Sequence, residues 1–271
     1  MTQQEGFRPS GRLARSGKCT LCGDQTKLTQ AHVPPRAAFN HGNFAWGGTT
    51  GDNRLAYGRS RLGGASRYAH CEACRASTSP WDDEYIKWAH CFAGHLVRSE
   101  EKGERTHITG ELTDVRPGRF IRAAIAGMTV LAPNLIDSDP ALVRIVREGI
   151  PASPPGDLRF LAAIAPNGTR AHVEGSHGAL ALHMSQEGGS GDRRITTTPT
   201  VSAVIHFPPF SLLLADRQLV GMFPHADCTE MLELGVDESA GMSVSLPIVD
   251  LPETPDAPVP IAMLQFIEVR A

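Results

Sequence analysis

The sequence predicts an α+β fold in two parts, and three observations lead to this expectation. Two Cys-x-x-Cys pairs lie between residues 19 and 74 and indicate a small N-terminal unit held together by its cysteines. Residues 118–132 place apolar side chains on one helical face. From about residue 157 the apolar period changes to two, which indicates strands of a mostly antiparallel sheet. We therefore expect a flexible basic arm over 1–16, a first domain over 17–98, a linker over 99–117 and an α+β domain of unknown role over 118–271.

The first domain is expected to begin with a cysteine knuckle and a strand. The knuckle spans residues 19–23, and a short strand follows near 27–31. Pro34 and Pro35 end this strand, because proline has no N–H to give to a strand ladder. Residues 40–68 are rich in glycine and arginine and predict a long loop or loose hairpin, which inside a compact domain is usually functional or mobile.

A helix is predicted to follow the second cysteine pair. Ser79 is a suitable cap, Pro80 suits the first helical position, and the acids of 82–84 suit the first turn. The aromatic residues of this helix recur at helical spacing, which favours a core face over a platform for ligands: Trp81, Tyr85, Trp88 and Phe92.

The second domain is predicted to combine two helices with a sheet. One helix covers residues 118–132, and the other begins at Pro140 and ends at Gly149. Strands are expected in five segments that turn-forming residues separate: LRFLAAI, GALALHM, TVSAVIHF, FSLLLAD and QLVGMF.

Charge is distributed unequally along the 271 residues. The formal net charge is −3, but residues 1–98 contain 13 Lys and Arg against 7 Asp and Glu, and residues 99–271 contain 13 against 22. The formal net charge is therefore +6 for residues 1–98 and −9 for residues 99–271. A polyanion is expected to bind the N-terminal part of the molecule. We expect no membrane partner, because no apolar run approaches the roughly 20 residues that span a bilayer. The N-terminal residues also lack the apolar region of a secretory signal.

Four of the six cysteines are expected to bind one structural zinc ion. Cys19 and Cys22 form one Cys-x-x-Cys pair, and Cys71 and Cys74 form the other, with 48 residues between the pairs. Two such pairs can supply the four thiolates of a closed tetrahedral zinc site, which has no open position for catalysis. Redox pairs and inert buried thiols are the alternatives. Secreted disulfide scaffolds are shorter and denser in cysteine, so a reducing, cytoplasmic location is expected.

Two stretches resemble a known family. The segments CTLCGDQTKLTQAHVPPR and CEACRASTSPWDDEY are similar to the HNH, or ββα-metal, endonucleases, in the subgroup with a Cys-x-x-Cys pair on each side of the core. The resemblance covers about residues 17–90 and implies a zinc-stapled ββα domain that hydrolyses phosphodiesters. It implies His32 as the general base that activates water. In this family the residue before that histidine and the residue after the second pair usually hold a divalent metal.

The chain departs from the family at both of these metal-ligand positions. They are Ala31 and Arg75, neither of which ligates a hard cation such as Mg²⁺ or Mn²⁺. Three hypotheses remain open. A nuclease could recruit its metal through other residues: His41, His70, Asp82, Asp83 or Glu84. Arg75 could replace the metal by clamping phosphate while His32 acts as base. The domain could instead be a zinc module that binds nucleic acid or protein without cleaving it. Small-molecule chemistry on the same fold is a further alternative.

Nucleic acid is the expected partner, DNA more than RNA. The arginines of the first domain are the candidate phosphate contacts, with a solvated basic loop as the alternative: Arg36, Arg54, Arg59, Arg61 and Arg67. A protein partner could bind through the C-terminal domain.

Overall fold

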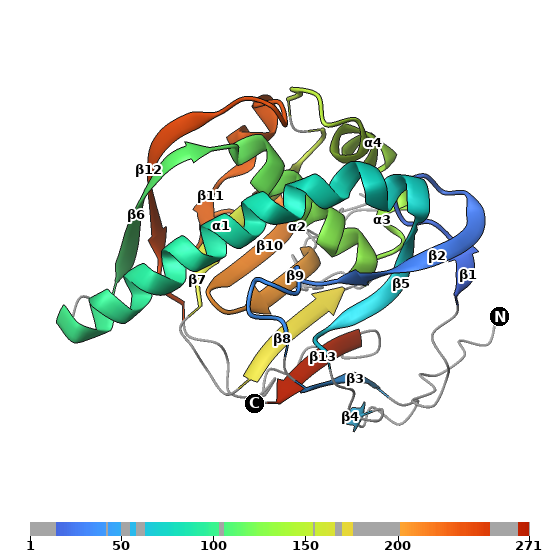
Figure 1. Cartoon of the computed structure of the whole chain (residues 1–271), viewed down its shortest axis with the longest axis horizontal. Coiled ribbons are helices and arrows are strands. Elements are labelled where there is room, and N and C mark those ends of the chain that lie inside the picture. The colour runs from blue at the N-terminus through green and yellow to red at the C-terminus, as the bar shows by residue number, and fades with distance from the viewer. Residues whose placement is uncertain are drawn as a thin grey trace, which may run out of the picture.

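The fold was analysed in a computed structural model (Figure 1). The structure describes residues 15–41, 43–49, 55–57, 63–102, 106–153, 155–165, 170–175, 201–249 and 265–270. It is a mixed α/β fold, and every strand pair in its three sheets is antiparallel.

The N-terminal part forms a small sheet that leads directly into a long helix. The sheet has the order β1-β2-β5, and the helix α1 follows β5 without a connecting residue. Its elements are β1 (Ser16–Lys18), β2 (Gln25–His32), β5 (Ser66–Cys71) and α1 (Glu72–Lys102). The strand predicted near 27–31 is confirmed within β2, and β2, β5 and α1 together form a ββα-like region.

Helix α1 begins earlier than the sequence predicts. It starts at Glu72, and Pro80 lies inside it rather than at its first position. The backbone N–H of Cys74 donates to the Sγ atom of Cys71 at 3.4 Å, so a cysteine sulfur takes the capping role that was expected of Ser79. The predicted core face is confirmed, because all four of its aromatic side chains are buried: Trp81, Tyr85, Trp88 and Phe92.

The large sheet joins strands from both ends of the sequence. Its order is β11-β7-β10-β9-β8-β13-β3-β4, so β13 at the C-terminus pairs with β3 from the front of the chain. The strands are β3 (Asn43–Thr49), β4 (Leu55–Tyr57), β7 (Leu158–Ile164), β8 (Arg170–Gly175), β9 (Val201–Phe207), β10 (Phe210–Asp216), β11 (Ala226–Asp227) and β13 (Gln265–Arg270). The predicted loop over 40–68 therefore contains β3, β4 and the start of β5, although a loose hairpin was one of the two expectations for it.

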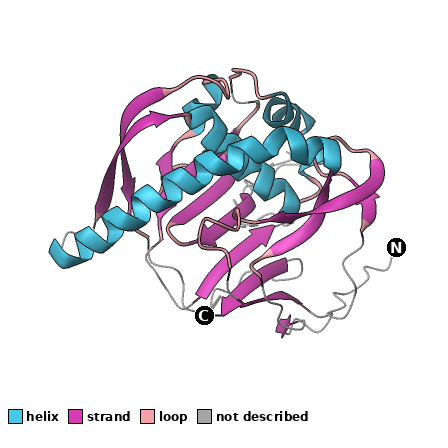
Figure 2. Cartoon of the chain, viewed as in Figure 1, coloured by secondary structure: helices cyan, strands magenta, loops and turns pink. Residues whose placement is uncertain are grey.

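Two further strands and three helices complete the described fold. Strand β6 pairs with β12, and helix α2 lies between α1 and the large sheet (Figure 2). The elements are β6 (His107–Val115), β12 (Ala240–Pro247), α2 (Pro117–Leu131), α3 (Leu135–Ser138) and α4 (Pro140–Glu148), with 3₁₀ turns η1 (Arg217–Leu219) and η2 (Thr229–Glu233). The segment 99–117, expected to be a linker, contains the end of α1 and strand β6.

The predictions for the second part have different outcomes. Both helices are confirmed, and Gly149 ends α4 in the left-handed conformation with φ of 68°. The strands expected over LRFLAAI, TVSAVIHF and FSLLLAD are confirmed as β7, β9 and β10. The strand expected over QLVGMF is wrong, because η1 and a turn occupy those residues. The segment GALALHM lies outside the described residues.

A stack of aromatic rings joins the N-terminal helix to the C-terminal sheet. The rings of Trp88 on α1 and Phe120 on α2 are nearly parallel, with centroids 4.2 Å apart. Phe120 in turn meets Phe210 of β10 edge-on at 5.5 Å. One buried core therefore extends from the cysteine-containing region to the large sheet. Among the described residues, no helix is both long enough and apolar enough to cross a membrane.

Candidate functional site

The four predicted cysteines come together at the junction of the small sheet and α1. Cys19 and Cys22 precede β2, Cys71 ends β5 and Cys74 lies in the first turn of α1. Their Sγ atoms all lie within 4.8 Å of one another, and those of Cys22 and Cys71 are 3.9 Å apart. Four sulfurs placed about 2.3 Å from a tetrahedral ion are separated by roughly 3.8 Å. The cluster could therefore hold a metal ion and is consistent with zinc.

The local backbone explains why the sulfurs converge. The N–H of Gly23 donates to the Cys19 carbonyl, and Gly23 has a positive φ of 82°, which turns the chain after Cys22. The N–H of Cys71 donates to the Cys19 Sγ atom at 3.2 Å, which ties the knuckle to the end of β5. Cys91 and Cys228, the two remaining cysteines, lie outside the cluster.

The chemistry of these thiols also suits a cation. Burial, as the largest cause, raises the pKa of Cys22 to about 12. Burial and the neighbouring sulfurs raise the pKa of Cys74 further. Burial acts in the same direction on Cys19, but hydrogen bonds from backbone N–H groups outweigh it and lower the pKa of Cys19. A divalent cation at the centre of the cluster would stabilise the thiolates.

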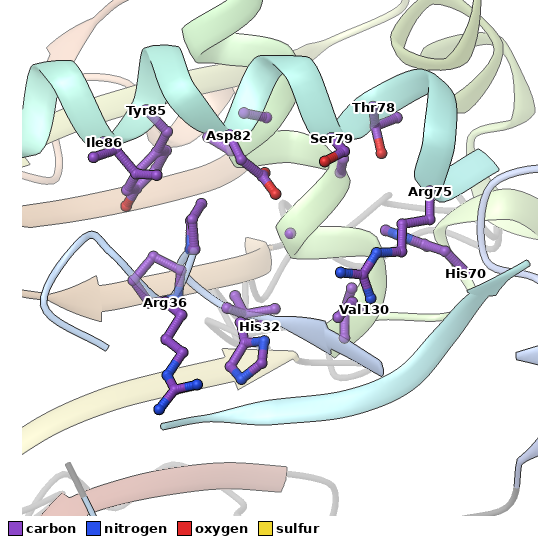
Figure 3. Close-up of a pocket in the computed structure, with 18 of the residues that line it drawn as sticks. His32, Arg36, His70, Arg75, Thr78, Ser79, Asp82, Tyr85, Ile86 and Val130 are labelled. Atoms are coloured by element: carbon purple, nitrogen blue, oxygen red, sulfur yellow. The ribbon is translucent and has the colours of Figure 1, made fainter. Parts of the chain in front are cut away.

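A cleft of about 300 Å³ lies next to the cysteine cluster, between the end of β2 and the N-terminal half of α1. Figure 3 shows α1 crossing above it, with His32 and Arg36 on the opposite side. Its lining includes His32, Arg36, His70, Arg75, Asp82 and Asp83, and small side chains of α2 form another part of its wall. The cleft thus brings together His32, Arg75 and Arg36, three residues that the sequence predicts as site residues.

His32 is held in a defined orientation at the end of β2. Its Nε2 atom lies 3.2 Å from the carbonyl oxygen of Gly63. Because a carbonyl only accepts hydrogen bonds, Nε2 carries the proton in this arrangement, and Nδ1 is left with the lone pair. Partial burial lowers the pKa of His32 below its ordinary value of 6.5, and the charges of Arg36 and Arg75 lower it further against the opposing effect of Gly63. The imidazole is therefore neutral at neutral pH and able to accept a proton.

Asn40 fixes the segment that carries the Gly63 carbonyl. It is fully buried, and its Nδ2 atom donates to the carbonyls of Pro34 and Ala65 at 2.6 and 3.0 Å. Its Oδ1 atom accepts from the N–H of Ala65 at 2.6 Å. Sequence reasoning missed Asn40, because nothing in the composition of the glycine-rich segment distinguishes it from other polar residues.

Arg75 is tethered so that its guanidinium faces the cleft. It lies in the first turn of α1, and its Nη1 atom donates to the carbonyl of Gln30 at 2.8 Å. This bond uses one of five guanidinium N–H groups, so the others remain able to bind an anion. Asp82 points toward the cleft from the next turns of the same helix (Figure 3). Loss of hydration raises the pKa of Asp82 to about 6, while the charge of Arg75 acts in the opposite direction.

The alternative metal ligands occupy different environments. His70 is buried, with Nε2 3.3 Å from the Thr129 hydroxyl, and burial lowers its pKa to about 4. Glu84 is buried and accepts a hydrogen bond from the Trp88 indole, outside the cleft. His41 is exposed and does not line the cleft. Within the described part of the chain, the four cysteines are the one group of three or more His, Cys, Asp or Glu side chains close enough to share an ion.

The predicted arginines are divided. Arg36 lines the cleft, and Arg67 lies on β5 at the position paired with Ala31 of β2. Arg54, Arg59 and Arg61 lie outside the described residues, so their role as phosphate contacts stays a prediction.

When compared with protein-family models, with curated proteins and with solved structures, the chain gave no significant match.

Proposed function

We propose that this protein hydrolyses phosphodiester bonds of nucleic acid in the cleft, with His32 as general base and Arg75 and Arg36 as phosphate-binding groups. The observation that carries the proposal is the presence of a neutral, oriented imidazole and two arginine residues, Arg36 and Arg75, in the lining of one cleft. Proton acceptance by a positioned histidine and charge stabilisation by arginine are the two effects that phosphodiester hydrolysis needs.

In the proposed reaction, the Nδ1 atom of His32 takes a proton from a water molecule. The water oxygen then forms a bond to phosphorus, and the bond from phosphorus to the leaving sugar oxygen breaks. Negative charge grows on the phosphoryl oxygens in the transition state, where a bidentate guanidinium is well suited to stabilise it. Arg75 is proposed for this role because its tether to Gln30 fixes it at little entropic cost during the reaction.

A divalent metal at the positions used by HNH enzymes does not fit this chain. Ala31 has no ligand atom, and Arg75 is cationic, so no step is assigned to Mg²⁺ or Mn²⁺ there. We propose zinc for the four-cysteine cluster, where it would join the knuckle to β5 and α1 and add to the stability of the fold. All four ligand positions would then be filled by protein, which leaves zinc without a position for substrate.

The presence of Ala31 and Arg75 at the metal-ligand positions of HNH enzymes favours a second candidate function, a zinc module that binds nucleic acid without cleaving it. Arg36 and Arg75 would contact phosphate in that case as well, and the two candidates differ in whether His32 does chemistry. Binding by this basic part of the chain would weaken steeply with added salt, since each phosphate contact releases counterions.

The test is cleavage of plasmid DNA and of structured RNA by the purified chain and by His32→Ala, with magnesium, with manganese and with chelator. His107→Ala is the matched control, because His107 is exposed at the start of β6 and does not line the cleft. Cleavage by wild type and His107→Ala that His32→Ala lacks would support the proposal. Cleavage that persists in chelator would favour Arg75 over a divalent metal. A folded, zinc-loaded wild type that cuts neither substrate would favour the binding module.

A further inference from the structure

Part of the cleft lining is apolar. Val130 of α2, Ile205 of β9 and Ile86 of α1 line it together with Pro34, whereas the charged groups come from Arg36, Arg75 and the acids of α1. The lining therefore places an apolar chamber next to a charged edge that holds both arginine and aspartate side chains. A volume of about 300 Å³ is at the lower end of pockets that enclose small molecules, and it is far too small for a base-paired duplex.

Tyr85 supplies a second, independent observation in this chamber. Tyr85 is 1% exposed. The centroid of its ring lies 5.5 Å from that of Phe120 and 5.8 Å from that of Phe210. Its hydroxyl oxygen is buried and has no hydrogen-bond partner among the described residues. Tyr85 nevertheless lines the cleft, and Figure 3 shows its hydroxyl end directed down from α1 toward the cleft.

A buried phenol without a partner is costly, because the hydroxyl has lost its hydration and gained no hydrogen bond in return. Burial raises the pKa of Tyr85 above its ordinary value of 10, so the group remains a neutral O–H donor. A ligand that brings a hydrogen-bond acceptor into the chamber would satisfy this donor. The ligand must also carry a flat or apolar part for the apolar lining and an anionic part for Arg36 and Arg75.

We propose that the cleft binds one unstacked nucleotide, with its phosphate at Arg36 and Arg75, its base in the apolar chamber and a base-edge acceptor at the Tyr85 hydroxyl. This inference rests on the function proposed above and assigns it a substrate class, single-stranded nucleic acid. Bases in a duplex are paired and stacked, so they would have to leave the stack before entering, whereas those of a single strand are already accessible.

The test measures binding in the His32→Ala background, so that cleavage does not interfere. A fluorescently labelled oligothymidine, the same strand paired in a duplex, and the strand with one abasic site are compared by anisotropy. We expect the single strand to bind most tightly and the duplex and abasic strands to bind more weakly. Unlabelled thymidine monophosphate serves as a competitor, and competition at an affinity close to that of the strand would assign the same chamber to a free nucleotide.

The decisive variant is Tyr85→Phe, which removes one hydroxyl and keeps the ring. Because the hydroxyl has no partner to lose, we expect the thermal stability to be unchanged or higher, while affinity for the single strand falls about five-fold, as expected for one hydrogen bond. Tyr68→Phe is the control, since Tyr68 lies on β5 outside the cleft lining. The loss in affinity distinguishes a binding role from a structural one.

Two outcomes would overturn the inference. One is equal affinity for duplex and single strand, and the other is unchanged affinity in Tyr85→Phe. Wild type that cleaves duplex DNA without any preference for single strands would contradict the nucleotide chamber and leave hydrolysis by His32 intact. Tyr85-dependent binding of single strands by a wild type that cleaves nothing would support the chamber and contradict the proposed hydrolysis.

Discussion

Asn40 and Ala65 are joined by two hydrogen bonds that run in opposite directions. The Asn40 side chain donates to the Ala65 carbonyl at 3.0 Å and accepts from the Ala65 N–H at 2.6 Å, so it pairs with this residue as a neighbouring strand would. A third bond, to the Pro34 carbonyl, links the pair to the chain that leaves β2. The buried Asn40 amide therefore joins the segment that follows His32 to the segment that contains Gly63, whose carbonyl oxygen is the hydrogen-bond partner of His32.

Replacing Asn40 with alanine is expected to lower the free energy of unfolding by about 2 to 4 kcal/mol, because it leaves several buried backbone groups unsatisfied. Urea unfolding measures the change. Asn134→Ala is the matched control: the Asn134 Oδ1 atom accepts no hydrogen bond from the described residues, so its loss should cost less than about 1 kcal/mol. Equal effects of the two substitutions would show that the Asn40 bonds do not hold the loop.

Gly63 and Gly64 provide a second matched pair at the same place. Both have positive φ, of 103° and 88°, so alanine strains the backbone at either position by about 1 kcal/mol. A Cβ atom on Gly64 would also lie 2.0 Å from the Asn40 carbonyl oxygen, whereas one on Gly63 meets nothing within 4 Å. We expect Gly64→Ala to be the more destabilising by a further ~1 to 3 kcal/mol in thermal or urea unfolding. The reverse order would contradict the close approach of these segments.

The sequence predicts the parts of this site that depend on spacing. The four cysteines can be assigned because Cys-x-x-Cys pairs are a local pattern, whereas the role of His32 is predicted from the resemblance of its segment to the HNH endonucleases. The start of α1 cannot be assigned in this way, since Cys71 caps the helix through a sulfur atom that the sequence presents only as a metal ligand.

Other features depend on contacts between distant residues. Pairing of β13 with β3 joins segments more than 200 residues apart, and no local pattern encodes that register. Asn40 and Tyr85 gain their importance from burial beside groups that lie far away in sequence. Tyr85 was predicted as part of a core face, which is correct, but its unpartnered hydroxyl at the cleft is visible only in three dimensions.

Cys71→Ser is expected to reduce bound zinc from about one ion per chain to a small fraction of that value, with a large loss of thermal stability. Metal content by mass spectrometry and melting with and without chelator measure both effects. Cys91→Ser is the control, because Cys91 lies outside the cluster and should leave the zinc content unchanged. A folded wild type that contains no zinc would refute the assignment of this metal.

The pH dependence of cleavage should report the charge around His32. Because its pKa lies below 6.5, activity that needs the neutral imidazole should persist at pH 6.5 and fall only at lower pH. Arg36→Gln removes one of the charges that disfavour imidazolium, so the pKa of His32 and the acid limb of kcat/KM should move to higher pH. An NMR titration of the His32 ring measures the same shift without activity. A pKa unmoved by the substitution would contradict the electrostatic coupling.

A separate prediction concerns a polar cluster on the large sheet. The Ser211 hydroxyl on β10 is fully buried and lies 2.5 Å from Nδ1 of His206 and 2.7 Å from Nε2 of His225. The Nδ1 atom of His225 is buried and has no hydrogen-bond partner among the described residues. Burial lowers the pKa of His225 to about 4, so the folded protein holds this imidazole neutral.

In the unfolded chain the pKa of His225 returns to about 6.5, so between pH 6.5 and 4 the unfolded state binds more protons than the folded state. The contribution of His225 is therefore fully present above pH 6.5 and is lost as the pH falls toward 4. His225→Gln removes this titration but keeps a polar side chain, so its free energy of unfolding should decline less steeply over that window than that of wild type. Because wild type and His225→Gln both contain the cysteine cluster, its effect on acid stability cancels when their free energies of unfolding are subtracted. His107→Gln, at an exposed position, should retain the wild-type slope, and a His225→Gln slope equal to it would show that His225 is not held neutral by the fold.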